Sequence, residues 1–401
     1  MRFVPDGPVI PNELIKEWRD GRVLFLAGAG VSKPAGLPLF DGLALDIYRH
    51  LNDGVLEALT AGSNNGRRSR FLASDRFSPE QKIEAELFLD RQLDRLFAAM
   101  EARLDHENGR LKYRKVRDGL EAVLRRAPTF AQGHKDLLRL SVPPGTVDAR
   151  TGALCRMATT NFDLLFEAAW RTEFSTDPRA YDARVAPRPG AHDFAGIVHL
   201  HGMLNNDATI PGQLVLSSRD FARVYLRSGV VANYIYDLIR RYTLVLVGYS
   251  ADDPPMRYLM DAIGEDASLF EDMKQPYAID ARTGKAPDDN GALAQARWGA
   301  KNIKPILFVA RGGKDPFAPL WETLHAWAEW ARDDANWVVS QLSDKMRVPY
   351  STSSAFASSF VRDLLSLLDS DEKERAILAV RSSGVDFGWI EALEGSFGSK
   401  A

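Results

Sequence analysis

The stretch Val23-Leu24-Phe25-Leu26-Ala27-Gly28-Ala29-Gly30-Val31-Ser32 decides the fold of this chain. Five apolar residues run directly into Gly-Ala-Gly and a hydroxyl side chain, which is typical of a buried parallel strand that ends in a tight turn. Because glycine has no Cβ, the backbone of such a turn can approach a phosphate closely. The stretch therefore predicts a strand and a dinucleotide-binding turn, with a plain strand-to-helix turn as the alternative.

The composition is that of an ordinary globular protein. The chain has 401 residues, of which 45% are hydrophobic and 26% are charged. This length exceeds what one core usually supports, so we expect a main domain with an insertion or an extension. The 51 basic and 54 acidic residues give a net charge of −3. That balance argues against direct nucleic-acid binding, which shows as a strong basic excess.

Cysteine content and hydropathy limit the class of protein further. Cys155 is the only cysteine, so the chain has no internal disulfide and no Cys-rich zinc site. Pro5, Gly7 and Pro8 interrupt the first ten residues and leave no apolar core of signal-peptide length. No run of roughly 18 apolar residues occurs, so no membrane-spanning helix is expected. We expect a cytoplasmic protein that does not associate with membranes.

Short apolar runs separated by helical patterns predict the fold class. Strands that alternate with helices indicate an α/β fold, which is Rossmann-like with a mostly parallel sheet and helices on both faces. The predicted strands are Val23–Ala27, Met157–Thr159, Ile197–Leu200, Leu214–Leu216, Thr243–Val247, Tyr277–Ile279 and Ile303–Val309.

Two segments read as helical additions to this sheet. In residues 51–150 we expect helices and no strand, with a capping box at Ser78-Pro79-Glu80-Gln81. Residues 316–401 also read as helical, and five tryptophans or leucines crowd the start of that segment. The predicted domains are thus a core of residues 1–50 and 151–315, a helical insertion and a helical C-terminal extension. The Trp-rich stretch, the C-terminal helices or the insertion are expected to form a subunit interface.

The residues after the glycine turn form a second feature. Position 33 is Lys33, so the third glycine of the dehydrogenase fingerprint is absent. The following stretch to Phe40 contains Gly36 and two prolines, of which one is Pro38. Proline fixes φ, and glycine permits φ values that other residues rarely adopt. We therefore expect a loop of defined conformation beside the turn. Ligands of open α/β sheets bind at such a place, beyond the carboxyl end of a strand.

A third feature is Thr159-Thr160-Asn161-Phe162-Asp163, which closes a strand and opens a helix. The functional interpretation is that the Asn161 amide orients a water or a ribose hydroxyl, while Asp163 supports the loop or the ligand. The alternative is that both side chains cap the following helix.

The fourth feature is Ile197-Val198-His199-Leu200-His201-Gly202. Two histidines on one face of a strand suggest a metal, but no further ligands stand at motif spacing, so no metal site is predicted. His201 at the end of the strand suits general-base chemistry near neutral pH. His199 is better interpreted as a buried core residue whose polar ring atoms have hydrogen-bond partners.

The last feature is a strand that runs into Gly248-Tyr249-Ser250 and then Asp252-Asp253. Gly248, Tyr249 and Ser250 are candidates for the second half of a dinucleotide site. Alone, they also fit a generic strand end.

These features, in this order, resemble the sirtuin family. The matching residues are Gly28-Ala29-Gly30-Val31-Ser32, Ala35 to Phe40, Thr159 to Asp163, His201-Gly202 and Gly248-Tyr249-Ser250. The resemblance implies that the first loop binds NAD and that Asn161 and Asp163 lie beside the nicotinamide ribose. It also implies that His201 is the catalytic base.

Departures from the family point to one branch of it. Sirtuin deacylases carry a zinc module with two cysteine pairs, which a chain with Cys155 alone cannot form. Asp41 and Thr160 stand where the deacylases have Arg and Gln. The pattern is similar to that of bacterial sirtuin-like proteins of antiphage defence, which degrade NAD. This branch implies a homo-oligomer and a separate activating partner, such as a HerA-like motor ATPase or a short Argonaute.

The resulting prediction is an NAD glycohydrolase with NAD as substrate and no zinc. The turn at Gly28, Ala29, Gly30 and Ser32 would hold the pyrophosphate, and the loop with Pro38 and Phe40 would enclose the nicotinamide ribose. Asn161 and His201 are the expected catalytic residues. The alternatives are a module that senses NAD or ADP-ribose without turnover and an NAD-dependent lysine deacylase.

Overall fold

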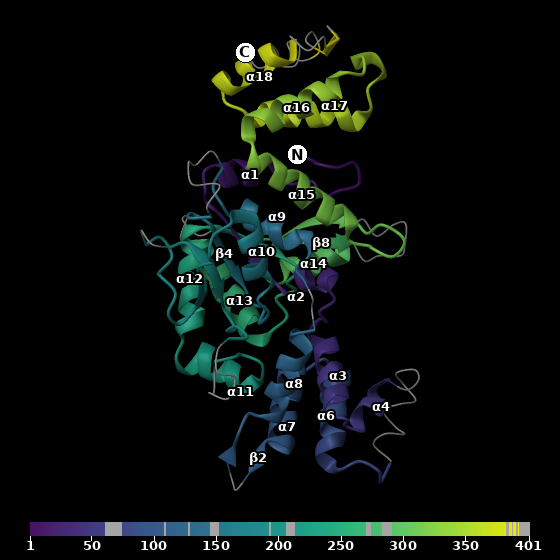
Figure 1. Ribbon diagram of the computed structural model, residues 1–401, viewed down its shortest axis with the longest axis vertical. Helices are drawn as coiled ribbons and strands as arrows, with labels where there is room; N and C mark the ends of the chain where they lie inside the picture. Colours follow the sequence, from purple (N-terminus) through teal and green to yellow (C-terminus); the bar gives the residue numbers. More distant parts are fainter. Residues whose placement is uncertain are drawn as a thin grey trace.

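The computed structural model shows a central sheet with a helical bundle at one end and the C-terminal helices at the other (Figure 1). It describes residues 1–60, 74–107, 110–126, 129–144, 152–191, 194–205, 213–269, 274–282, 291–381, 385–386, 388–389 and 392.

The sheet has seven strands in the described part of the chain, and every pairing between neighbours is parallel. The strands are β1 (Val23–Ala27), β4 (Arg156–Thr159), β5 (Ala180–Asp182), β6 (Gly196–His199), β7 (Thr243–Val247), β8 (Tyr277–Arg282) and β9 (Lys304–Val309). Their order is β5-β6-β4-β1-β7-β8-β9. Strands β4, β5 and β6 lie on one side of β1 and strands β7, β8 and β9 on the other, which places a topological switch point between β1 and β7.

Strand β1 lies at the centre of the molecule and is buried on both faces. All five of its residues are buried. Phe25 packs into one hydrophobic cluster, while Leu24 and Leu26 pack into the cluster on the opposite face. Burial on both faces explains why this strand reads as a continuous apolar run instead of an alternating one.

Helices cover both faces of the sheet, which confirms the predicted α/β class. On the face of Phe25 they are α1 (Asn12–Arg19), α9 (Gln132–Leu140), α10 (Leu165–Phe174) and α15 (Ala318–Arg332). On the face of Leu24 they are α12 (Val230–Arg241), α13 (Pro254–Leu269) and α14 (Ala292–Gly299). Helix α9 comes from the segment predicted as the helical insertion, yet it packs against α10 and α15 on the sheet.

A separate helical bundle follows β1 and has its own hydrophobic core. Its helices are α3 (Phe40–His50), α4 (Val55–Thr60), α6 (Pro79–Leu89), α7 (Leu93–Leu104) and α8 (Lys115–Leu124). The predicted capping box is confirmed, because Ser78 Oγ accepts from the Gln81 amide at 3.3 Å and Gln81 Oε1 accepts from the Ser78 amide at 3.0 Å. The expectation of no strand here was wrong: β2 (His106–Glu107) and β3 (Arg110–Leu111) form a short antiparallel hairpin.

The predicted strand at Leu214–Leu216 is also wrong. This backbone binds scattered partners instead of a neighbouring strand. Arg117 Nη1 donates to the Leu214 carbonyl at 3.0 Å, the Val215 amide donates to the His201 carbonyl at 2.8 Å, and the Leu216 amide donates to Asp220 Oδ2 at 3.2 Å. The apolar run reflects burial at the edge of the helical bundle. Conversely, β5 was missed, since it is only three residues long and has no apolar run.

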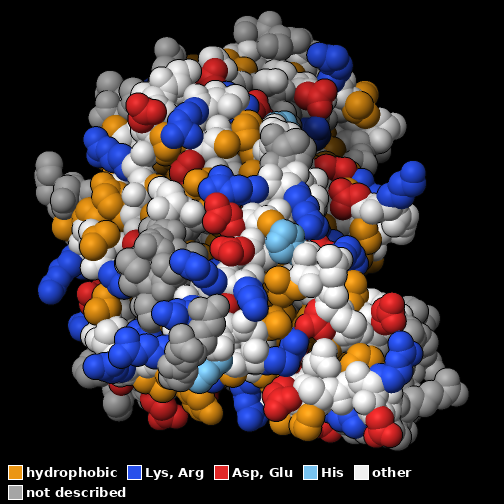
Figure 2. All heavy atoms as spheres, turned by 60° about the horizontal axis from the view of Figure 1, so that its bottom comes forward, with side chains coloured by type: hydrophobic (Ala, Val, Ile, Leu, Met, Phe, Trp, Pro, Cys, Tyr) orange, Lys and Arg blue, Asp and Glu red, His pale blue; other side chains and the backbone are white. Residues whose placement is uncertain are grey.

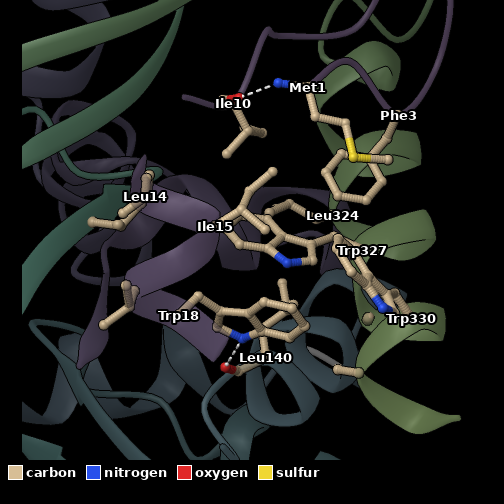
Figure 3. Packing of buried hydrophobic residues seen from close by; sticks show 14 of the residues in the cluster. Met1, Phe3, Ile10, Leu14, Ile15, Trp18, Leu140, Leu324, Trp327 and Trp330 are labelled. Atoms are coloured by element: carbon tan, nitrogen blue, oxygen red, sulfur yellow. Dashed lines mark hydrogen bonds between the residues drawn. The ribbon is translucent and has the colours of Figure 1, made fainter. Parts of the chain in front are cut away.

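The C-terminal helices are α16 (Asp334–Met346), α17 (Ala355–Leu367) and α18 (Ser370–Arg381). A cluster of aromatic rings that includes Phe3, Trp18, Trp327 and Trp330 is buried in the protein (Figure 3). Trp327 lies 5.3 Å from Trp18 and 5.8 Å from Phe3 between ring centroids. The Trp18 indole donates to the Leu140 carbonyl at 3.0 Å. Trp18, Trp327 and Trp330 are buried within the chain between α1, α9 and α15. The subunit interface expected from the sequence stays a prediction. None of the described helices has the length and apolar character needed to cross a bilayer.

Replacing Trp327 with alanine should lower the free energy of unfolding by about 3–5 kcal/mol, because a fully buried indole and its ring contacts are lost. Urea unfolding followed by circular dichroism measures this change. The control is Tyr258→Ala, whose side chain is 73% exposed and which should stay within about 0.5 kcal/mol of wild type. Equal effects of the two substitutions would contradict the assignment of Trp327 to the core.

Candidate functional site

The predicted site residues follow the carboxyl ends of four strands that are neighbours in the sheet. Gly28–Ser32 follows β1, Asn161 and Asp163 follow β4, His201 follows β6, and Gly248–Ser250 follows β7. Parallel strands end at one edge of a sheet, so residues far apart in the sequence meet there. A cavity of about 590 Å³ lies at the opposite edge, where Thr243, Tyr277 and Lys304 begin β7, β8 and β9. It contains none of the predicted site residues.

The glycine turn after β1 packs directly on the turn after β7. The Gly28 amide donates to the Val247 carbonyl at 3.0 Å, and the Gly30 amide donates to the Gly248 carbonyl at 2.8 Å. A Cβ on Gly30 would lie 2.7 Å from Gly248 Cα. Contact between the two strand ends thus requires these glycines, whether or not a phosphate binds. The two amides are used within the protein, so a phosphate would have to bind other groups of the turn.

Ser32 is the point at which the glycine turn after β1 meets the Thr159–Asp163 segment after β4. It lies at the end of the short helix α2 (Ala29–Ser32) and is buried. Its Oγ donates to Asp163 Oδ2 at 2.9 Å and accepts from Asn161 Nδ2 at 3.0 Å. The predicted residues Ser32, Asn161 and Asp163 are therefore brought together in one hydrogen-bonded cluster.

Asp163 performs two tasks in that cluster. Its Oδ1 accepts from the Leu165 amide at 3.1 Å, at the start of α10, so the capping interpretation holds for this residue. Its Oδ2 accepts from Ser32. Burial raises the pKa of the Asp163 carboxyl, while the bonds from Leu165 and Ser32 oppose that rise. Both oxygens are engaged, which fixes the loop between β4 and α10.

His134 of α9 is a member of the cluster that the sequence analysis missed. Its ring is fully buried, and Nε2 lies 3.2 Å from Ser32 Oγ. Burial lowers the pKa of His134 to about 4, so the ring is neutral at neutral pH. No motif surrounds His134 in the sequence, and only its place on the buried face of a helix singles it out.

His199 is a core residue, as predicted. It is completely buried, and both ring nitrogens have partners: Nδ1 lies 2.9 Å from the Asn161 carbonyl and Nε2 lies 2.7 Å from Glu167 Oε1. Burial opposes ionisation of this ring, but the bond to Glu167 prevails and raises the pKa of His199. His199 therefore ties β6 to the loop that carries Asn161.

His201 lies two residues farther on and contacts a helical segment instead of the Ser32 cluster. Its Nε2 is 2.8 Å from the Tyr225 hydroxyl, and its ring stands edge-on to Phe221 with centroids 5.4 Å apart. Phe221 ends α11 (Ser218–Phe221), and Tyr225 lies in the π-helical turn Ala222–Arg227. Burial lowers the pKa of His201 to about 4. Sequence reasoning also missed Tyr225.

The loop after β7 is held by its own side chains. The Tyr249 hydroxyl donates to Asp253 Oδ1 at 2.7 Å. Lys301 Nζ donates to the Ser250 carbonyl at 2.7 Å and to Asp252 Oδ1 at 2.6 Å. Gly248 adopts a φ of +63°. Of the three candidates here, Ser250 is the exposed one.

Pro38 and Phe40 lie at the start of the helical bundle. The stretch after Ser32 forms a 3-10 turn at Lys33–Ala35 and then bends at Gly36, where φ is +92°. The Phe40 ring lies 5.0 Å from that of Phe97 in α7, and Phe40 packs against the bundle core. The predicted loop is thus anchored to the bundle, which couples the edge of the site to these helices.

In the part of the chain that the structure describes, no three His, Cys, Asp or Glu side chains gather in a way that suits a metal ion.

One segment of the chain is similar to a known family. Residues 156–306 match the family model described as a SIR2-like domain. That segment includes Asn161, Asp163, His201 and Gly248, while Ser32 and His134 lie outside it. The match describes similarity over this segment.

Similarity to two individual proteins was also found. The uncharacterized protein y4cA of Sinorhizobium fredii is 33% identical over 335 residues, which are 82% of this chain and 24% of that protein. The chain thus spans about a quarter of the length of that curated relative. The crystal structure of a Sir2 homolog–NAD complex is 15% identical, with a TM-score of 0.35, and the match covers 82% of this chain and 97% of that one.

Replacing Gly248 with alanine should destabilise the protein by about 2 kcal/mol or more, because a side chain there needs positive φ and the new Cβ would lie 2.7 Å from the Val31 amide nitrogen. Urea unfolding measures the change. The control is Gly299→Ala in α14, where no atom lies within 4 Å of the added methyl; it should leave stability unchanged or raise it by up to about 1 kcal/mol. A Gly248→Ala substitution that leaves the free energy of unfolding unchanged would contradict the close approach of the two turns.

Acidification should destabilise the protein through His201. Burial lowers its pKa from the ordinary 6.5 to about 4 in the folded state, so between these pH values the unfolded chain binds a proton that the folded chain excludes. The contribution of neutral His201 to the free energy of unfolding is fully present above pH 6.5. It is lost as the pH falls towards 4, by an amount on the order of 3 kcal/mol.

The measurement is urea unfolding at several pH values between 7 and 4. His134 contributes in the same direction and His199 in the opposite one, so the comparison is with a variant. His201→Gln should show a shallower loss than wild type, while the exposed control His106→Gln keeps the wild-type slope. Equal slopes in wild type and His201→Gln would refute the burial of a neutral His201.

Proposed function

We propose that the chain is an NAD glycohydrolase, which breaks the nicotinamide–ribose bond of NAD and releases nicotinamide and ADP-ribose. The observation that carries the proposal is the buried Ser32–Asn161–Asp163 cluster, which lies at the carboxyl ends of β1 and β4 and beside β6 with His201. The match of residues 156–306 to a SIR2-like domain supports the same interpretation.

The switch point beside β1 offers the place for the dinucleotide. Ligands of open α/β sheets bind in the crevice outside the carboxyl ends of the strands, where the strand order reverses. Ala29 and Gly30 are half-buried there, and Ser250 of the neighbouring loop is exposed. The pyrophosphate would lie against the turn at Ala29 and Gly30, with the other half of NAD towards Ser250. The nicotinamide ribose would then point towards Asn161.

The hydrogen bonds decide which atoms are free for chemistry. The Asn161 amide donates from Nδ2 to Ser32, so its Oδ1 is the end that can accept from a water or a ribose hydroxyl. With Nε2–H of His201 donating to the Tyr225 hydroxyl oxygen, Nδ1 keeps its lone pair and can take a proton. As the nicotinamide bond breaks, positive charge develops on the ribose. A base at a ribose hydroxyl and a held water would then accelerate hydrolysis, by roughly 10²–10⁴-fold for the base.

The conformation described here is a resting one under this proposal. Ser32 is 1% exposed, and Asn161 and His201 are each 6% exposed. A His201 with a pKa of about 4 is a weak base at neutral pH. Movement of the segment with Phe221 and Tyr225 would expose His201 and raise its basicity. The proposal therefore includes low activity of the isolated protein.

Assembly and context belong to the same proposal. The resemblance to sirtuin-like proteins of antiphage defence favours a cytoplasmic, NAD-depleting effector that forms a homo-oligomer. A separate partner, such as a HerA-like motor ATPase or a short Argonaute, would activate it. Basic and acidic side chains are interspersed on the face shown in Figure 2, in keeping with the proposal that the chain itself does not bind nucleic acid.

The test is release of nicotinamide from NAD, followed by chromatography, for the protein alone and with the product of its neighbouring gene. Asn161→Ala and His201→Ala should each lower the rate by about 10²-fold or more. The matched controls are Asn336→Ala and His106→Ala, which change exposed residues of the same types away from the site and should keep the wild-type rate.

Three outcomes would overturn the proposal. Equal rates in the variants and in wild type would remove Asn161 and His201 from the chemistry. Tight NAD binding without any product would identify a sensor module. Turnover that requires an acyl-lysine peptide would identify a deacylase.

A further inference from the structure

The Ser32 hydroxyl has three side-chain partners from two different segments. Asp163 Oδ2 lies at 2.9 Å and Asn161 Nδ2 at 3.0 Å, both from the loop after β4. His134 Nε2 lies at 3.2 Å and comes from α9. All four residues are buried, so a wrongly placed hydrogen in this cluster would leave a polar group without a partner.

Counting hydrogens assigns every bond in the cluster. A serine hydroxyl has one hydrogen and two lone pairs. The Asp163 carboxylate can only accept, so it takes the hydroxyl hydrogen, and the Asn161 Nδ2 group can only donate, so it takes one lone pair. The third partner must then donate, which places a hydrogen on Nε2 of His134.

The other side of the His134 ring agrees with this assignment. A neutral imidazole with its hydrogen on Nε2 has a lone pair on Nδ1. The Ala131 amide, just before α9 begins, lies 3.2 Å from Nδ1 and can donate to it. The Ala131 carbonyl oxygen also lies 3.2 Å from Nδ1, so the three partners of Ser32, and not this side of the ring, place the hydrogen on Nε2. Burial lowers the pKa of His134 to about 4, which keeps the ring in this neutral form. The ring stands edge-on to Phe166, with centroids 4.8 Å apart, so it has little freedom to rotate.

This arrangement differs from that of a serine nucleophile. In a nucleophilic triad the histidine accepts the serine hydrogen and a carboxylate binds the far side of the imidazole. Here the carboxylate of Asp163 binds Ser32 itself, and the far side of His134 faces the backbone of Ala131. The Ser32 oxygen is held as an acceptor for two donors, which makes it unsuited to attack.

We propose that His134 is a positioning residue, which acts through Ser32 to hold the Asn161 amide with Oδ1 turned towards the substrate. Its Nε2–H occupies one lone pair of Ser32 and directs the serine hydrogen to Asp163, so that the remaining lone pair accepts only from Asn161 Nδ2. If His134 no longer donated, Ser32 could rotate and the amide of Asn161 could turn over. This inference rests on the proposed function only for its kinetic test.

The variants are His134→Leu, which removes the donor at similar size, and His134→Gln, whose amide nitrogen can take the place of Nε2. For nicotinamide release, His134→Leu should lower kcat by about 10–100-fold, as is usual for residues that orient an active group. KM for NAD should stay within about threefold, since His134 does not touch the substrate. His134→Gln should restore most of kcat. A merely structural role would affect both variants alike.

A double-substitution experiment separates action through Asn161 from other effects. In the background of Asn161→Ala, His134→Leu should cause no further loss of kcat, because the residue that it positions is absent. Independent losses that multiply would overturn the proposal.

A second readout needs no activity. In protein with 15N-labelled asparagine and histidine, the Asn161 side-chain amide resonances should move in His134→Leu and stay in place in His134→Gln. The wild-type His134 nitrogen shifts should show a hydrogen on Nε2. If NAD is never hydrolysed but these shifts behave as expected, the proposed function fails and the positioning role stands. Unmoved Asn161 resonances in His134→Leu would overturn the positioning role itself.

Discussion

The close contact between the turn after β1 and the turn after β7 is the constraint on which the candidate site depends. Gly30 and Gly248 approach so closely that a Cβ on either would meet backbone atoms within 2.9 Å. This contact fixes where α2 begins, and α2 places Ser32 against the loop after β4. The glycines thus act first on the protein's own packing, and any phosphate site is built on that packing.

Sequence reasoning was most successful where burial dictated the residue pattern. β1 and β7 were predicted with their observed limits, since both are buried along their whole length and read as apolar runs. The sequence analysis placed the Gly28–Ser32 turn and the Thr159–Asp163 segment at strand ends. The structure brings these ends together, and Ser32 contacts Asn161 and Asp163 there. Leu214–Leu216 was wrong, because an apolar run records burial and does not record what its backbone binds.

Sequence reasoning did not identify the site residues that lie on helices. His134 and Tyr225 lie in segments without any motif, and they reach Ser32 and His201 only through the packing of α9 and of the π-helical turn. Their spacing from the other site residues is 102 and 24 positions. Only the folded arrangement brings such partners together.

The helical bundle is joined to the His201 region by a buried ionic cluster. Arg117 of α8 binds Asp220 of α11, and it also binds Glu101 of α7 at 2.6 Å. Asp220 immediately precedes Phe221, which packs on His201. A movement of the bundle would therefore be transmitted to the residues that cover His201, and this gives the proposed resting state a physical connection to the rest of the molecule.

The measurement that tests the central claim most directly is a crystal structure, with NAD bound, of His201→Ala, which should hydrolyse NAD about 10²-fold or more slowly than wild type. The account predicts NAD at the carboxyl edge of the sheet, with a hydroxyl of the nicotinamide ribose or a bound water within about 3.5 Å of Asn161 Oδ1. NAD bound instead in the cavity at the amino ends of β7, β8 and β9, or with its nicotinamide ribose away from Asn161, would contradict it.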